Sequence, residues 1–255
     1  MSDIRLYNLK KQKELKITSV TKSNLQGLIE ANSLSLLGVE VIFSNINITG
    51  KNGEIVESFG YDEDKRLVVI EYHQGKNSPT IHKGLEYLDY IRNNLGKIKV
   101  LFKEKLGDEA KELIYDPRLI VIGEDFNSYD GKAITFLPFD IDLIKCILVD
   151  KDIIALEKIY QNFASSDVKI TNDDNINKLY RLVDEVAYSY GDELCKSYLN
   201  GCVSYRRIKN FMYVYYLNGL NVVLKIDNKF KSFIIKSEKD LEKITPLIEE
   251  AYDEN

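Results

Sequence analysis

The sequence predicts an α/β fold: a mixed central sheet with flanking helices over residues 1–160, then a small α+β domain over residues 172–255. A length of 255 residues suits two ordinary domains. In the first 150 residues, segments with the 3.6-residue period of amphipathic helices alternate with short strand-like segments. A polar stretch at 161–173 then resembles a linker, and beyond it the pattern changes.

The first region is expected to hold three helices and six strands. Aliphatic residues recur with helical spacing from Leu25 to Leu37, and Gly38 is placed to end that helix. Ser78 and Pro79 form a typical helix start for a second helix that stops near Gly96. A short helix is expected at 109–114. Strands are predicted at residues 39–43, 55–61, 66–73, 97–102, 119–122 and 141–149.

The second region reads as helix first, then strands, then helix. Apolar spacing predicts helices at 176–187 and 192–199. Three short strands are expected at 211–217, 221–226 and 232–236. Ser237 opens a last helix. This order of elements indicates a small α+β domain.

Composition excludes several classes of protein. With 44% hydrophobic and 29% charged residues, the chain is not generally disordered. No apolar run is long enough to span a bilayer, the N-terminus lacks the apolar stretch of a signal peptide, and the three cysteines form no C-x-x-C pair. We therefore expect a cytoplasmic protein. A net charge of −5 argues against a protein that coats nucleic acid, although a metal-dependent nuclease itself needs carboxylates.

Carboxylates on neighbouring elements carry the chemistry. Glu57 lies in one strand of a predicted hairpin, and Glu71 lies near the end of the other, followed by Tyr72 and His73. Alternation puts Glu71 and His73 on one face of the strand. Two carboxylates and the Tyr72 carbonyl are oxygen ligands that Mg²⁺ accepts, and Glu30 on the preceding helix adds a third carboxylate. Beside a phosphodiester, such an ion activates water and stabilises the leaving group.

This order of elements resembles the PD-(D/E)xK nucleases. The helix with Glu30, the strand with Glu57, the strand at 71–73 and the helix at 83–88 follow one another as in the bacterial and archaeal branch that includes mismatch-specific endonucleases. Further resemblance lies in segments 28–32, 36–39 and 117–126. The second region resembles an uncharacterised domain often fused behind that nuclease, at 191–193, 205–207, 210–211 and 240–243. The resemblance implies a restriction-endonuclease-like fold for residues 1–160.

The chain departs from the family pattern at three positions. The pattern places Asp where this chain has Glu57, Lys where it has His73, and Gln where it has Lys83. At its ordinary pKa, a histidine is charged only in part at pH 7. We therefore hypothesise that Lys83 has taken over the charge lost at His73.

The resemblance implies a Mg²⁺- or Mn²⁺-dependent deoxyribonuclease that hydrolyses DNA phosphodiester bonds. DNA is then the expected partner, with no membrane association and with a homodimer left open. The implied catalytic residues are Glu57, Glu71, His73, Lys83 and Glu30, and the implied metal ligands are Glu57, Glu71 and the carbonyl of Tyr72. The alternative is a catalytically degenerate nuclease fold that binds nucleic acid or a partner protein; the histidine at position 73 favours it.

Two basic segments are candidates for contact with nucleic acid. A run of lysines at 97, 99, 103 and 105 could meet a phosphate backbone, or could form the exposed face of a half-buried strand. Tyr205, Arg206, Arg207 and Lys209 interleave positive charge with aromatic residues, which suits stacking on bases and also suits packing within a strand.

Overall fold

The computed structural model describes residues 4–50, 54–73, 80–150, 152–162, 168–191, 194–199 and 201–255. The chain divides into two compact units, Met1–Asn162 and Phe163–Asn255. The predicted helix start at 78–79, residues 192–193 of the second region's signature and part of the 161–173 linker lie outside the described residues. The domain limits at 160 and 172 thus stay predictions.

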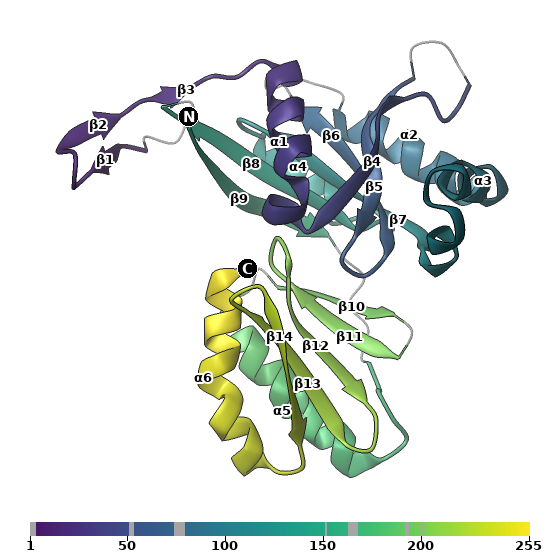
Figure 1. Cartoon of the computed structure of the whole chain (residues 1–255), viewed down its shortest axis with the longest axis vertical. Helices are drawn as coiled ribbons and strands as arrows, with labels where there is room; N and C mark the ends of the chain where they lie inside the picture. The colour runs from purple at the N-terminus through teal and green to yellow at the C-terminus, as the bar shows by residue number, and fades with distance from the viewer. Residues whose placement is uncertain are drawn as a thin grey trace. The chain divides into compact units, whose positions relative to one another are not determined.

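The first unit is built on a mixed seven-stranded sheet (Figure 1). Its order is β3-β8-β7-β6-β5-β4, with β9 also paired to β8. The strands are β3 Ile17–Thr18, β4 Val39–Ile46, β5 Val56–Asp62, β6 Arg66–His73, β7 Ile114–Gly123, β8 Ile141–Val149 and β9 Ile153–Asn162. Strands β6, β7 and β8 are parallel and the other neighbours antiparallel. We call the edge where β6, β7 and β8 end, and where β5 begins, the carboxyl edge.

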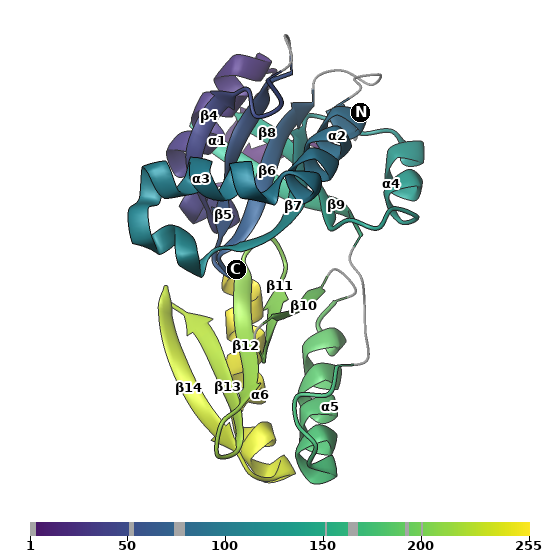
Figure 2. The ribbon, with the colours of Figure 1, turned by 90° about the vertical axis from the view of Figure 1, so that its right-hand side faces the viewer.

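Helices cover both faces of this sheet (Figures 1 and 2). Helix α1 (Lys22–Leu37) lies on one face, and α2 (Thr80–Asn93) and α3 (Leu95–Leu106) lie on the other. A 3₁₀ turn, η1 (Gly107–Glu112), and a short helix, α4 (Ser128–Ile134), complete the unit. Helix α1 ends at Gly38, as predicted, because its left-handed φ of 63° suits glycine.

Close packing fixes α2 and α3 on their face. A Cβ atom at Gly84 would lie 2.5 Å from a methyl of Leu119, so only glycine lets α2 approach β7 this closely. From α3, Phe102 meets Phe43 and Phe59 edge-on, with ring centroids 5.2 and 4.9 Å apart. The core of the first unit is therefore built around this face.

Two expectations for the first unit are wrong, and one strand was not expected. Residues 97–102 belong to helix α3 and not to a strand, because Ile98 and Phe102, four residues apart, are both buried. The lysines at 97, 99, 103 and 105 therefore lie on a helix surface. Lysines two residues apart also fit the alternation of a strand, which explains the wrong prediction. The expected helix at 109–114 is the 3₁₀ turn η1. Strand β9, which pairs along the whole of β8, was not predicted.

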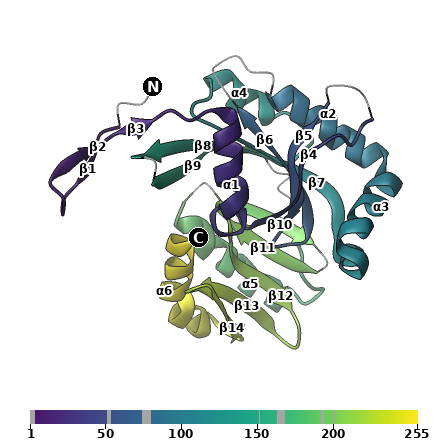
Figure 3. The ribbon, with the colours of Figure 1, turned by 45° about the horizontal axis from the view of Figure 1, so that its top comes forward.

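A separate two-stranded hairpin precedes the sheet. It consists of β1 (Leu6–Asn8) and β2 (Lys13–Leu15) and extends away from the main sheet of this unit (Figure 3). It pairs Leu6 with Leu15 and Asn8 with Lys13.

The second unit is a five-stranded antiparallel sheet covered by two helices. Helices α5 (Asp174–Ser189) and α6 (Glu238–Glu254) contact each other and both contact β13, so they share one face of the sheet. The strands are β10 Cys195–Leu199, β11 Cys202–Arg206, β12 Asn210–Tyr216, β13 Leu220–Ile226 and β14 Lys229–Ile235, in that order. The last three strands and the last helix were predicted. The expected helix at 192–199 is wrong, because its described residues from 195 onward form β10.

The predicted fold class is confirmed: mixed α/β with a mixed central sheet, followed by a small α+β unit. Among the described residues, no helix is both long and apolar enough to cross a bilayer.

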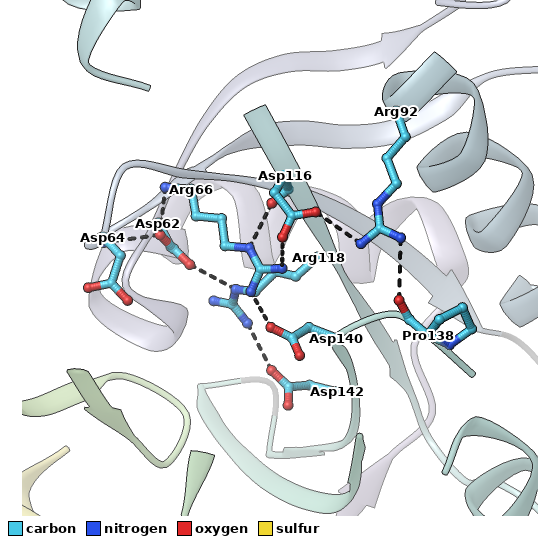
Figure 4. Close-up of polar contacts among 9 residues, drawn as sticks. All are labelled: Asp62, Asp64, Arg66, Arg92, Asp116, Arg118, Pro138, Asp140 and Asp142. Carbon is cyan, nitrogen blue, oxygen red and sulfur yellow. Dashed lines mark hydrogen bonds and ion pairs between the residues drawn. The ribbon is translucent and has the colours of Figure 1, made fainter. Parts of the chain in front are cut away.

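A network of buried ion pairs ties the strands together at the edge opposite the carboxyl edge (Figure 4). The Arg118 side chain, only 1% exposed, donates to Asp62 and to Asp142, each at 2.8 Å. Arg66 donates to the carboxylate of Asp116 at 2.7 Å and forms an ion pair with Asp140. We call this set, with Arg92 at its rim on Asp116, the arginine network. It links β5, β6, β7 and the start of β8.

Candidate active site

Two carboxylates meet in a gap between β5 and β6. Backbone pairing of these strands reaches Ser58 and Ile70, and the next positions along are Glu57 and Glu71. At these positions the backbone amides bond to carboxylates of the neighbouring strand instead of to its backbone. The Glu57 amide donates to Glu71 Oε1 at 3.1 Å, and the Tyr72 amide donates to Glu57 Oε2 at 2.9 Å. The Glu71 side chain is fully buried and Glu57 nearly so. Both carboxylates are thus held firmly at the carboxyl edge.

Lys83, from the first turns of α2, lies against both carboxylates. Its Nζ is 3.2 Å from Glu71 Oε2 and 3.5 Å from Glu57 Oε1, and it donates to the carbonyl of Ile55 at 2.9 Å. Burial by itself would lower the pKa of Lys83, but the charges of Glu71 and Glu57 outweigh burial and raise that pKa. The ammonium group therefore stays charged beside the acidic pair.

The pKa of Glu71 is raised even with Lys83 beside it. Burial raises the pKa of Glu71, the neighbouring Glu57 raises it further, and Lys83 only partly offsets them, leaving a pKa of about 7. A cation close to this carboxyl group would lower its pKa.

Helix α1 adds a stripe of polar residues at four-residue spacing. Lys22 forms an ion pair with Glu57 Oε1. Gln26 donates to the Glu57 carbonyl at 2.8 Å and to Glu30 Oε1 at 2.9 Å. Lys22 and Gln26 were not predicted as site residues. The available signal was their spacing, four and eight residues before Glu30 on one helix.

Glu30 does not join the acidic pair. Its carboxylate accepts from Ser58 Oγ at 2.6 Å and from Ser44 Oγ at 2.9 Å, on the α1 side of the sheet. The Tyr72 hydroxyl, 3.0 Å from Ser58 Oγ, belongs to the same polar group. Within the described ranges, no three or more Asp, Glu, His or Cys side chains are grouped to hold a metal ion. Glu30 is therefore not grouped with Glu57 and Glu71 as a third acid, and its catalytic role stays a prediction.

His73 is buried in an aromatic environment. Its ring stacks on Phe126, with centroids 4.9 Å apart and planes at 20°. Lys83 and Lys22 are charged groups in contact with the carboxylates. A catalytic role for His73 stays a prediction.

The basic, aromatic segment of the second unit is mostly internal. Tyr205 is fully buried and donates to Asp184 at 2.8 Å, and Arg206 is also buried. Stacking of bases on Tyr205 or contact through Arg206 is therefore excluded by burial, and the prediction is wrong for these two residues. Arg207 lies over the Tyr252 ring, 4.4 Å from its centroid. Nucleic-acid contact through Arg207 and Lys209 stays a prediction.

The acidic pair fits a divalent cation. Mg²⁺ is usually held by one or two carboxylates, with water and substrate phosphate completing its shell. Glu57 and Glu71 supply two such carboxylates, held side by side at the carboxyl edge. The Tyr72 carbonyl as a further ligand stays a prediction.

No family model matches the chain. An uncharacterised protein of Haemophilus influenzae is 26% identical over 188 residues, which cover 72% of this chain and 60% of that protein. The solved complex of EndoMS with double-stranded DNA matches 51% of this chain and 47% of that chain, at 16% identity and a TM-score of 0.34.

Proposed function

We propose that this protein is a Mg²⁺- or Mn²⁺-dependent deoxyribonuclease that hydrolyses phosphodiester bonds of DNA. The observation that carries the proposal is the convergence of Glu57 and Glu71 in the gap between β5 and β6, with Lys83 in contact with both. The choice of DNA as substrate comes from the sequence resemblance. A cytoplasmic location belongs to the same proposal.

In this proposal, the residues divide the work. Glu57 and Glu71, with the Tyr72 carbonyl, hold the cation, which when bound activates water and polarises the phosphoryl group. Lys83, anchored by the Ile55 carbonyl, donates to a phosphate oxygen and offsets the charge that develops there. Glu30 acts indirectly: its hydrogen bonds with Gln26 and Ser58 hold α1 against β5.

Cleavage assays with matched variants test the proposal. Single-stranded, duplex, branched and mismatched DNA would be incubated with Mg²⁺, with Mn²⁺ and with excess EDTA. Glu71→Gln and Glu57→Gln should each lower cleavage by about 10²- to 10³-fold. Each variant should also lose the Mn²⁺ binding that calorimetry measures in the wild type. Glu104→Gln, a change at an exposed carboxylate of α3, is the control and should cleave normally. Cleavage in excess EDTA, or full activity of Glu71→Gln, would overturn the proposal.

The second candidate is a binding protein that has kept the scaffold but does not cut. The specific observation in its favour is His73, which stands where the family has lysine and is stacked on Phe126. Saturable DNA binding without metal-dependent cleavage of any of the four substrates would establish this alternative.

A further inference from the structure

The N-terminal hairpin concentrates positive charge in an acidic protein. We call residues 4–16 the N-terminal arm. Its charged residues are five basic and one acidic, giving +4 (5 − 1), whereas the whole chain carries −5. The basic residues are Arg5, Lys10, Lys11, Lys13 and Lys16, and the acidic residue is Glu14.

Packing does not explain this composition. No residue of the arm is buried, and at its tip Leu9 is 83% exposed, with Tyr7 57% exposed beside it. The arm forms its own two-stranded sheet, which has no hydrophobic core of its own. Lys13 forms an ion pair with Asp150 at 3.4 Å, whereas Lys10 and Lys11 at the tip are exposed and available to an external partner.

The arm is rooted at the carboxyl edge. At its base, the Lys16 amide donates to Asp150 Oδ1 at 3.0 Å, directly after β8. The next residues form β3, which pairs Ile17 with Val149 and Thr18 with Leu148, beyond the point where β7 stops pairing with β8 at Lys145. The arm thus leaves the unit from the same sheet edge that carries the acidic pair.

The chain then continues along this edge to the candidate active site. The Val20 amide donates to Glu124 at 3.0 Å, just after the end of β7. Two residues later, Lys22 contacts Glu57. The segment from the arm to α1 therefore passes the ends of β8 and β7 and arrives at β5. Figure 3 shows the arm extending outward from this side of the sheet.

We propose that the N-terminal arm binds the phosphate backbone of duplex DNA and guides the duplex to the carboxyl edge. This rests on the nuclease function proposed above. A net charge of −5 repels DNA at long range, so a local basic arm supplies the attraction that the rest of the chain lacks. A two-stranded β-ribbon also fits the major groove, where Lys10 and Lys11 of the tip reach phosphates on either side.

A double variant tests the arm in the full chain. Binding of a fluorescent duplex would be measured by anisotropy in EDTA, so that cleavage plays no part. Lys10→Gln with Lys11→Gln should weaken binding by about 10-fold or more at about 0.1 M salt, and should reduce the slope of log K against log salt concentration by about 2. Thermal unfolding should be unchanged, because no residue of the arm is buried.

The control is a second pair of exposed lysines on a hairpin strand. Lys229→Gln with Lys231→Gln on β14 changes the net charge equally and should leave binding within about 2-fold. Equal weakening by both double variants, or no weakening by the arm variant, would overturn the proposal. So would binding to phosphatidylserine vesicles in place of DNA. If the wild type binds DNA through the arm but cleaves nothing, the arm proposal stands and the nuclease proposal fails.

Discussion

The two edges of the central sheet both bury charge, but they do so in opposite ways. At the arginine network, Arg118 lies between two carboxylates and all three side chains are at most 5% exposed. At the carboxyl edge, two carboxylates lie side by side, and the cations that contact them are lysines whose side chains remain about one third exposed.

The difference separates a fully paired cluster of charges from one that contains a carboxyl group with a raised pKa. Arginine offers a rigid planar fork that satisfies two carboxylates at once, so the network is electrostatically paired within itself. Glu57 and Glu71 repel each other, and the pKa of Glu71 rises to about 7 as a result of burial and of that repulsion. A buried carboxyl group with a raised pKa beside a second carboxylate is typical of sites that bind a cation or transfer protons.

The largest effect on folding should come from breaking the arginine network. Arg118→Met removes the guanidinium group that pairs with the buried Asp62 and Asp142, and should lower the free energy of unfolding by about 3–5 kcal/mol. Arg92→Met at the partly exposed rim should cost only about 1 kcal/mol or less. Urea unfolding of both variants measures the difference. Equal, small losses would show that the buried pairs are not structurally important.

The next effect sharpens the other edge and depends on pH. The pKa of Glu71 is raised from 4.5 to about 7 in the folded state, so the folded state binds the proton more tightly than the unfolded state. The associated stability is complete below about pH 4.5 and is lost as the pH rises through about 7, by at most about 3 kcal/mol. Glu71→Gln should remove this loss. The free energies of unfolding of this variant and of the wild type, measured at pH 5 and pH 8 in EDTA, give the contribution of Glu71. The same change with pH in both proteins would contradict the prediction.

The smallest effect distinguishes the two lysines of the acidic pair. Lys83 touches both carboxylates and Lys22 only Glu57. In a cleavage assay at saturating Mg²⁺, Lys83→Met should therefore lose about 100-fold and Lys22→Met about 10-fold. Lys103→Met, on the exposed face of α3, is the matched control and should retain activity. Unchanged cleavage by Lys83→Met would rule out the idea that this lysine replaces the charge lost at position 73.

Local sequence was sufficient where partners are close along the chain. Strands β5 and β6 are joined by a turn of a few residues, so alternation alone placed Glu57 and Glu71 on adjoining strand ends. It failed for α3, because lysines on every second residue imitate a strand while the burial of Ile98 and Phe102 demands a helix. Local sequence also failed to predict the burial of Tyr205. Alternation shows which residues of a strand share a face, but only packing decides which face becomes part of the core.

By itself, the sequence determined the acidic pair, the hairpin that bears it and the α/β class, since each follows from short-range periodicity. The tertiary structure decided which cations reach the pair. Lys22 and Lys83 come from helices on opposite faces of the sheet, and their approach depends on how the buried stripes of α1 and α2 pack. Packing between distant elements also determines that Glu30 bonds to Ser58 and that His73 stacks on Phe126. Such contacts join residues far apart in the chain, so they depend on how the whole core packs and not on neighbours in sequence.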